Sequence, residues 1–273
     1  MLNYNKSYFT RYLNLLGIPL QKPSLNALTE IVKTQMFKIP FENISKIYYF
    51  KKTGLKGIPE FDQYLSGIEN YHFGGTCYTI NYYLYLLLAF LGYDVRFCGA
   101  DMSRADVHTA IIVSLGGQEY IVDAGYAAPF LEPLPCSLNT DYVINLGKSK
   151  YILKPQDAEY RSKIEYYQNG SLRHGYMLKP QPRHINEFNK VIIESFNPDA
   201  TFMNSLLLTK YSTESSYIIH NNNFTEIQNN SEYVKSLIKK EDLIETINNF
   251  FGMPAEILET VINGLSMNHG VWD

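Results

Sequence analysis

Two adjacent glycines, a cysteine and a long apolar run constrain the fold of this chain more than any other stretch. Gly74 and Gly75 allow the backbone to turn tightly, and Cys77 lies two residues after Gly75. The uninterrupted apolar stretch over residues 82–91 is typical of a buried helix and is too short to span a bilayer. The pattern predicts that Cys77 begins a core helix. The free N–H groups and positive dipole end at a helix start favour a thiolate, the nucleophilic form of cysteine.

A histidine and an aspartate stand at the ends of two predicted strands downstream. His108 lies at the mouth of an apolar, β-branched run, and a Gly-Gly turn at 116–117 leads into a second run that ends at Asp123. In a hairpin centred on this turn, residues whose numbers add up to about 233 face each other, so Asp123 lies diagonal to His108. The arrangement predicts that Asp123 fixes the tautomer of His108 and that His108 deprotonates Cys77.

Each of these residues also has a purely structural alternative. Free cysteines are often buried and inert, a histidine beside an aspartate is often a structural pair, and Asp123 could be a turn residue. His72 is the histidine nearest to Cys77 in sequence and is the fallback base. The other histidines lack a cysteine or carboxylate at suggestive spacing, and we expect structural or exposed roles for His174, His184, His220 and His269.

The residues around the predicted triad resemble those of the arylamine N-acetyltransferases. Cys77 in a Gly-Gly-x-Cys helix start, His108 in Val-His-Thr and Asp123 in Val-Asp-Ala-Gly-Tyr are similar to that family's Cys–His–Asp triad in identity and separation. Residues 8–11 (Tyr-Phe-Thr-Arg) and 39–44 (Ile-Pro-Phe-Glu-Asn-Ile) also resemble its helical-bundle signatures. The motifs cover about the first half of the chain; beyond them, only order and length support the resemblance.

Two positions depart from the family's pattern. Phe73 stands where the family usually has an arginine, and Thr79 stands where it usually has a glutamate. The family's arginine braces the helices through the glutamate that corresponds to Glu42. We therefore expect Glu42 to have found another partner or to be solvated. The departures concern the support of the site and its substrate preference more than the triad.

The resemblance implies a fold and a reaction. The expected α+β fold has an N-terminal helical bundle carrying the cysteine (1–91), a central antiparallel β-barrel carrying the histidine and aspartate (92–183), and a C-terminal α/β lid (184–273), around a core like that of cysteine proteases and transglutaminases. The implied activity is ping-pong transfer of acetyl from acetyl-CoA, through a Cys77 thioester, to an arylamine, arylhydrazine or arylhydroxylamine. Coenzyme A is the implied donor partner, no metal is needed, and Tyr126 is expected to line the acceptor pocket.

Hydrophobic periodicity and turn residues predict individual elements within this plan. One helix is expected at residues 4–16, and a second follows the N-cap Ser24 and runs up to the stop at Pro40. A loop over 48–72 is expected to contain a short helix near Phe61–Leu65. Antiparallel strands of a barrel or strongly curved sheet are expected at 95–98, 107–115, 119–122, 142–144, 151–153, 164–167 and 173–178. The last third is expected to hold a helix through Ser195, strands near 206–209, 217–220 and 224–227, and helices at 242–251 and 255–263.

Composition restricts the class of partner and compartment. A net charge of −3 gives no basic excess, which disfavours nucleic acid as a partner. The three cysteines, Cys77, Cys98 and Cys136, are odd in number and widely spaced, which disfavours disulfides and a zinc ribbon and favours a reducing, cytoplasmic setting. The start of the sequence shows no export signal, so we expect a cytoplasmic protein that does not enter a membrane. Nothing in the composition sets the oligomeric state.

Other functions can use the same triad. A transglutaminase-like or papain-like hydrolase needs the same three residues and an open peptide cleft, and an amide synthase that closes rings on carrier-bound polyketides shares the triad. A degenerate binding module is suggested by the uncharged residues Phe73 and Thr79. The completeness of the triad favours acyl transfer, although the residues alone do not separate acetyl from propionyl or malonyl donors.

Overall fold

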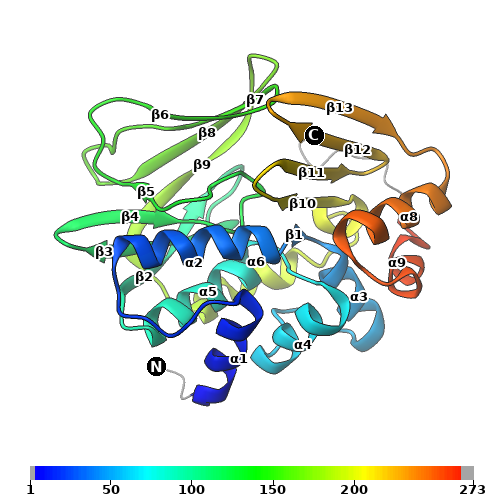
Figure 1. Cartoon of the computed structure of the whole chain (residues 1–273), viewed down its shortest axis with the longest axis horizontal. Helices are drawn as coiled ribbons and strands as arrows, with labels where there is room; N and C mark the ends of the chain where they lie inside the picture. Colours follow the sequence, from blue (N-terminus) through cyan, green and yellow to red (C-terminus); the bar gives the residue numbers. More distant parts are fainter. Residues whose placement is uncertain (1–3, 266–273) are drawn as a thin grey trace.

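Five helices precede the first long strand in this computed structural model, which describes residues 4–265 of the chain. They lie in the lower part of Figure 1 and are α1 (Lys6–Leu16), α2 (Leu25–Lys38), α3 (Ile44–Thr53), α4 (Phe61–Tyr71) and α5 (Cys77–Phe90). Gly17 ends α1 in a left-handed conformation, and the Ser24 side chain caps α2 by accepting from the Ala27 N–H. The helix predicted to begin at Cys77 is confirmed; Met1 and His269 lie outside the described residues.

The loop predicted over residues 48–72 is wrong in most of its length. α3 continues to Thr53, and α4 runs to Tyr71 rather than stopping near Leu65. The buried face of α3 packs against α9 (Ala255–Ile262), and the two lie side by side in Figure 1. This helix therefore depends on a partner about two hundred residues away, which local periodicity does not reveal.

The middle of the chain forms an antiparallel sheet of eight strands that curls around its own apolar face (Figure 1). The strand order is β5-β4-β3-β2-β9-β8-β7-β6. The bounds are β2 (Asp94–Asp101), β3 (His108–Leu115), β4 (Gln118–Val122), β5 (Leu134–Pro135), β6 (Tyr142–Leu146), β7 (Ser149–Leu153), β8 (Ser162–Gln168) and β9 (Ser171–Pro182). Within residues 4–265 the edge strands β5 and β6 do not pair with each other, so of the two expected forms the sheet is the strongly curved, open one and not a closed barrel. β5 has only two residues and cannot continue the ladder around a barrel.

The last third contributes a second sheet, which reaches back to the helices. β1 (Phe41–Glu42) pairs with β10 (Leu207–Tyr211), and the sheet continues through β11 (Ser215–His220), β12 (Asn223–Gln228) and β13 (Ser231–Ser236). α8 (Lys240–Phe251) and α9 pack on it through a shared apolar cluster. Between the two sheets the chain forms the short helices η1 (Ile185–Phe188), α6 (Asn189–Glu194) and α7 (Thr201–Asn204). The sequence prediction missed β13, whose side chains are mostly exposed.

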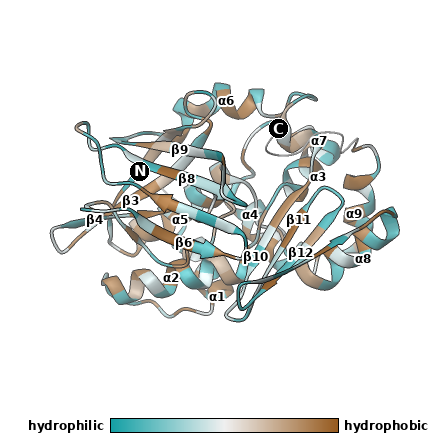
Figure 2. Cartoon of the chain, turned by 90° about the horizontal axis from the view of Figure 1, so that it is seen from above, coloured by the Kyte–Doolittle hydropathy of each residue, from teal (hydrophilic) through white to brown (hydrophobic). Residues whose placement is uncertain are grey.

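α5 is the central element of the largest apolar cluster. Ile80, Leu84 and Leu87 are fully buried, and the cluster joins α5 to α1, α2, α4 and the sheet strands β2 and β3. Figure 2 shows hydrophobic residues concentrated in these inner segments, whereas the outer hairpin tips are hydrophilic. Across residues 4–265 no helix combines the length and apolarity needed to cross a bilayer.

Candidate active site

Cys77 lies at the end of a backbone turn that requires glycine. Gly75 has a φ of 144°, and a Cβ on Gly74 would lie 1.8 Å from the carbonyl oxygen of Pro40. The close approach allows Gly75 to bridge to Phe41, the first residue of β1. The glycine pair therefore packs the start of α5 against the strand that joins the second sheet, and the Cys77 side chain is left 7% exposed.

His108 and Asp123 meet as the hairpin register predicts. Ile111 pairs with Val122 across β3 and β4, which fixes the expected alignment of the two strands. His108 begins β3, Asp123 follows β4, and His108 Nε2 lies 2.8 Å from Asp123 Oδ2. Both side chains are buried, so this ion pair is not screened by water.

The Asp123 carboxylate is held by donors on three sides. Tyr176 OH donates to Oδ2 over 2.7 Å, and Asn81 Nδ2 and the Gly125 N–H donate to Oδ1 over 2.8 and 3.0 Å. Burial raises the pKa of Asp123, but the charge of His108 and these hydrogen bonds outweigh burial, so that the pKa lies below its usual range. Asp123 is therefore an ionised group that can orient His108 and stabilise its charge.

Asn81 and Tyr176 are site residues that the sequence analysis missed. Asn81 lies one turn after Cys77 on α5, where it donates to the Thr109 carbonyl over 2.6 Å and accepts from the Ala124 N–H over 3.0 Å. A single amide in an otherwise apolar helix, four residues after the cysteine, was a detectable signal. Tyr176 lies on β9, and nothing local in the sequence connects it to Asp123.

His108 is placed to exchange a proton with Cys77. Burial lowers the pKa of His108, but the charge and hydrogen bond of Asp123 and the adjacent Cys77 raise it above its usual value. Because Nε2 is engaged by Asp123, Nδ1 is the ring nitrogen left for the thiol. The fallback base His72 instead ends α4, with its ring packed against Gly252.

Tyr126 connects this group of residues to a large cavity. Its ring lies 5.4 Å from the His108 ring and 4.8 Å from the Tyr176 ring, measured between centroids. A cavity of about 260 Å³ lies between the two sheets, with walls that include Tyr126, Tyr151, Tyr166, Arg173, Thr209 and His220. A ligand in this cavity would therefore contact aromatic side chains next to His108.

His174 lines the same cavity and fixes the Tyr126 hydroxyl. Tyr126 OH lies 2.9 Å from His174 Nδ1. Burial, helped by the charges of His108 and Arg173, lowers the pKa of His174 to about 3. His174 is therefore neutral near pH 7, and its Nδ1 shares a hydrogen bond with the Tyr126 hydroxyl. Spacing in the sequence indicated only a structural or exposed role for His174.

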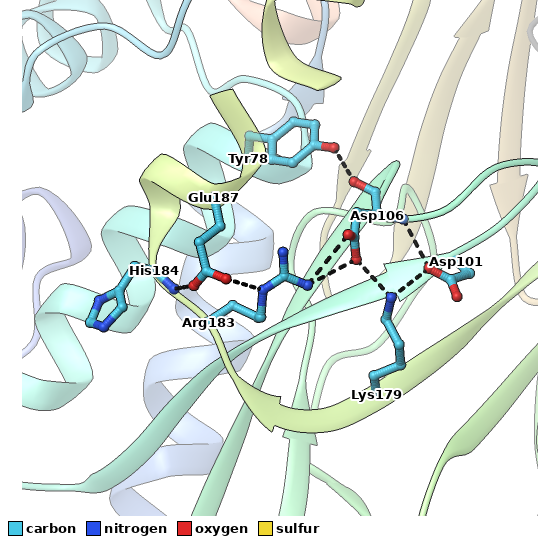
Figure 3. Close-up of polar contacts among 7 residues, drawn as sticks. All are labelled: Tyr78, Asp101, Asp106, Lys179, Arg183, His184 and Glu187. Carbon is cyan, nitrogen blue, oxygen red and sulfur yellow. Dashed lines mark hydrogen bonds and ion pairs between the residues drawn. The ribbon is translucent and has the colours of Figure 1, made fainter. Parts of the chain in front are cut away.

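A network of charged residues holds the loop that precedes His108 (Figure 3). Asp106 has a left-handed φ of 58°, and its carboxylate accepts from Lys179 Nζ over 2.7 Å and from Arg183 Nη1 over 3.3 Å. The Asp106 carbonyl accepts from Tyr78 OH over 2.5 Å. Tyr78 directly follows Cys77, and Asp106 lies two residues before His108. The network therefore connects the start of α5, which carries Cys77, to the loop that leads to His108.

Glu42 has found partners other than an arginine. Its side chain is fully buried, and its two carboxylate oxygens accept from the backbone N–H groups of Ser45, over 2.8 Å, and Gly74, over 2.9 Å. Because Glu42 is buried, the expected alternative of a solvated Glu42 is wrong. Phe73, at the position of the family's arginine, packs in the apolar cluster around α3 and the second sheet. Burial raises the pKa of Glu42, although these hydrogen bonds oppose it.

The raised pKa of Glu42 makes the stability of the protein depend on pH. The Glu42 carboxyl binds its proton more tightly in the folded protein than in the unfolded chain, where the pKa of a glutamate is about 4.3. Wild-type stability therefore falls, relative to Glu42→Gln, as pH rises from that value through the folded pKa. We expect the free energy of unfolding of Glu42→Gln to gain on wild type by at most ~1.4 kcal/mol per pH unit.

Urea unfolding of both proteins between pH 4.5 and 8 measures this difference. Glu256→Gln, on the exposed face of α9, controls for the loss of one negative charge. A difference between wild type and Glu42→Gln that stays constant over this range would contradict the raised pKa.

The other two cysteines have no comparable surroundings. Cys98 and Cys136 are free and buried, and burial raises the pKa of each thiol to about 12. In the described part of the chain, no three histidine, cysteine, aspartate or glutamate side chains are grouped so that they could hold a metal ion. Cys77 is therefore the cysteine with a neighbouring base.

Comparison with known proteins places these features in a family. A sequence model of a family described as N-acetyltransferase matches residues 24–259. The chain is 23% identical to arylamine N-acetyltransferase 1 of Oryctolagus cuniculus, covering 90% of this chain and 89% of the relative. It is 24% identical to the uncharacterized acetyltransferase YvcN of Bacillus subtilis, covering 84% and 91%.

Solved structures show the same fold. The structure of Mycobacterium marinum arylamine N-acetyltransferase in complex with CoA superposes with a TM-score of 0.76 at 19% identity, covering 94% of this chain and 99% of that one. The enzyme from Mycobacterium abscessus superposes equally well, with a TM-score of 0.76 at 17% identity and coverage of 93% and 94%. Since the family model spans most of the sequence and these relatives agree with it over most of their length, the chain belongs to the arylamine N-acetyltransferase family.

Proposed function

We propose that Cys77, His108 and Asp123 are the catalytic triad of an enzyme that transfers acetyl from acetyl-CoA to an arylamine, arylhydrazine or arylhydroxylamine. The observation that carries the proposal is the buried His108–Asp123 pair, 2.8 Å apart, beside a cysteine at a helix start. The donor is inferred from the family and from the relative of known structure that binds CoA. The roles are nucleophile for Cys77, general base and acid for His108, and orienting carboxylate for Asp123.

In the first half-reaction Cys77 takes the acetyl group. Its thiol proton passes to His108, and the thiolate attacks the carbonyl carbon of the acetyl-CoA thioester. The bond from that carbon to the coenzyme A sulfur then breaks, and coenzyme A leaves with the proton from His108. The new thioester on Cys77 is similar in energy to the old one, so neither step is steeply uphill. Backbone N–H groups at the start of α5 are our candidates for stabilising the oxyanion.

In the second half-reaction the acceptor takes the acetyl group from Cys77. The nitrogen of an arylamine attacks the thioester carbon, His108 accepts the nitrogen's proton, and Cys77 leaves as a thiolate. We assign the acceptor to the cavity beside Tyr126, because its aromatic walls can stack on an aromatic ring. The partners are thus small molecules and coenzyme A.

The three-part organisation is part of this proposal. We infer that residues 1–91 supply the nucleophile, residues 92–183 supply the base and carboxylate, and residues 184–273 act as a lid. Support for the lid comes from the second sheet, whose strands β10 and β11 form one wall of the cavity. We also propose a cytoplasmic location, because Cys77, Cys98 and Cys136 are all unpaired.

A cysteine hydrolase is the alternative with the same residues. A peptide hydrolase needs an open cleft along its nucleophile, whereas Cys77 is 7% exposed and the nearby cavity lies between two sheets. Enclosure of the nucleophile suits acyl transfer, because water competes with the acceptor for the thioester.

Mass spectrometry of the intact protein and its peptides tests the proposal. After brief incubation with acetyl-CoA and no acceptor, we expect one acetyl group on the Cys77 peptide. Addition of anisidine should remove it and yield acetylanisidine. An adduct that water removes as fast as anisidine does would indicate a hydrolase, and an acetyl group on a residue other than Cys77 would contradict the assigned nucleophile.

A further inference from the structure

Lys46 is a half-buried cation with few partners beside the start of α5. It extends from α3, donates to Ser195 Oγ over 2.7 Å and lies 4.3 Å from the centre of the Phe196 ring. The Ser195 hydroxyl in turn donates to the Ile192 carbonyl over 2.6 Å, so it can only accept from Lys46. Within residues 4–265 no carboxylate pairs with Lys46, and one neutral hydroxyl is its hydrogen-bond acceptor.

Two other lysines of the described chain, Lys51 and Lys179, are better satisfied. Lys51 donates to three carbonyl oxygens at the end of α9, and Lys179 donates to the carboxylates of Asp101 and Asp106. A structural role accounts for both of them. Lys46 instead keeps donor capacity that its protein neighbours leave unused, because an ammonium group has three N–H bonds.

Lys46 lines a small cavity. Its volume is about 30 Å³, and its walls include Gly75 and Thr76 from the turn before α5 and Tyr78 and Thr79 from the first turn of the helix. This space holds one or two water-sized groups and excludes an aromatic ring. The positive end of the α5 dipole faces the same place, and together with Lys46 it favours a small anion.

Lys46 is also close enough to the nucleophile for their charges to interact. Burial lowers the pKa of Lys46 to about 8, and a negative charge on Cys77 opposes that change. Lys46 is therefore mostly protonated at neutral pH. Residues on both sides of Cys77 in sequence, Thr76 and Tyr78, line the cavity. The backbone of Cys77 therefore lies beside the place that favours an anion.

We propose that Lys46 and this cavity form a carboxylate subsite, and that the enzyme accepts short acyl thioesters ending in a carboxylate, such as malonyl-CoA. The inference rests on the proposed role of Cys77 as the acyl carrier. The chemistry is unchanged: the thiolate of Cys77 attacks the thioester carbon, the bond to the coenzyme A sulfur breaks, and coenzyme A leaves protonated by His108. The terminal carboxylate keeps its charge throughout and accepts hydrogen bonds from Lys46.

Alkylation of Cys77 tests the subsite without coenzyme A. Iodoacetate and iodoacetamide react by the same displacement of iodide and differ in the charge of one group, which lies as close to sulfur as a short acyl terminus. We expect the rate constant for iodoacetate divided by that for iodoacetamide to fall about 10- to 100-fold in Lys46→Met, because this is the range for a lost hydrogen bond between charged groups. In Lys46→Arg this ratio should be largely restored. Both rate constants are measured on the same preparation of each variant, so differences between preparations cancel in the ratio.

Lys210→Met is the matched control for this ratio. Lys210 is also partly buried and donates to the Phe250 carbonyl over 3.1 Å, and burial lowers its pKa without any contribution from Cys77. We expect its ratio to equal that of wild type. An equal ratio in wild type and Lys46→Met, or an equal fall in both variants, would overturn the subsite.

Acylation by malonyl-CoA and acetyl-CoA gives the second readout. Wild-type Cys77 should be malonylated at a rate within about 10-fold of acetylation, and Lys46→Met should lower the malonyl-to-acetyl ratio at least about 10-fold.

Acetylation of wild type without malonylation would overturn the subsite and leave the proposed function intact. Failure of both donors, while the iodoacetate ratio still responds to Lys46→Met, would reject the proposed function and support the anion site. If Lys46→Met lowered transfer to 4-aminobenzoate relative to aniline but left the donor ratio unchanged, the carboxylate would belong to the acceptor and the proposal would be wrong.

Discussion

Replacing Cys77 by serine is expected to lower kcat/KM for acetyl transfer to an arylamine by at least about 10⁴-fold. The acetyl ester of a serine is more stable than a thioester, so a weak nucleophile such as an aromatic amine cannot remove the acetyl group at a useful rate. The hydroxyl is also a much weaker acid than a thiol, and His108 would have to remove its proton fully during attack. Initial rates of coenzyme A release with anisidine as acceptor measure the effect.

The two other cysteines provide the controls for this substitution. Cys98→Ala and Cys136→Ala remove buried thiols whose pKa burial raises to about 12, and both should keep rates near that of wild type. Transfer by Cys77→Ser within about tenfold of wild type would show that acetyl passes directly from donor to acceptor. Loss of transfer in Cys98→Ala alone would move the nucleophile to β2.

Asp123→Asn is expected to have the next largest effect, a fall in kcat/KM of about 10³- to 10⁴-fold. An amide places an N–H group where a carboxylate oxygen now accepts from His108, from Tyr176 or from Asn81. At least one donor then faces another donor, His108 loses the tautomer that leaves Nδ1 for Cys77, and the imidazolium loses its counter-charge. The protein should also lose about 3–5 kcal/mol of stability, as expected for one partner removed from a buried pair.

Rates and urea unfolding curves on the same preparations separate these two effects. Asp141→Asn is the control, because Asp141, just before the edge strand β6, forms an exposed ion pair with Lys154, 2.7 Å long. It should change stability by less than about 1 kcal/mol and leave the rate unchanged. A folded Asp123→Asn protein with the wild-type rate would remove Asp123 from the mechanism.

The residues of the proposed triad were accessible from sequence because local rules fix their positions. The Gly-Gly turn sets the register of the hairpin, so the pairing of Ile111 with Val122 follows from turn chemistry, and His108 comes within reach of Asp123. A glycine pair before an apolar run sets the start of α5 by the same kind of rule. These relations involve short separations in the chain, where backbone geometry leaves few choices.

The supporting residues were not accessible in the same way, because distant contacts place them. Tyr176 reaches Asp123 because β9 pairs with β2, although the strands β3 to β8 lie between the two in sequence. Lys46 is on a helix that the sequence did not predict, and its hydroxyl partner is contributed by the residue after α6. The open sheet in place of a barrel has the same origin, since closure depends on how two edge strands meet.

The pairing of β1 with β10 has a consequence for the order in which the enzyme matures. A ribosome completes α5 well before it makes Leu207–Tyr211, the strand that closes on Phe41 and Glu42. Until that strand emerges, nothing holds β1 from its open side, and the turn at Gly75, which bridges to Phe41, lacks its final support. A growing chain therefore carries a cysteine whose activating geometry is unfinished, and reactivity towards acyl thioesters should appear only late in synthesis.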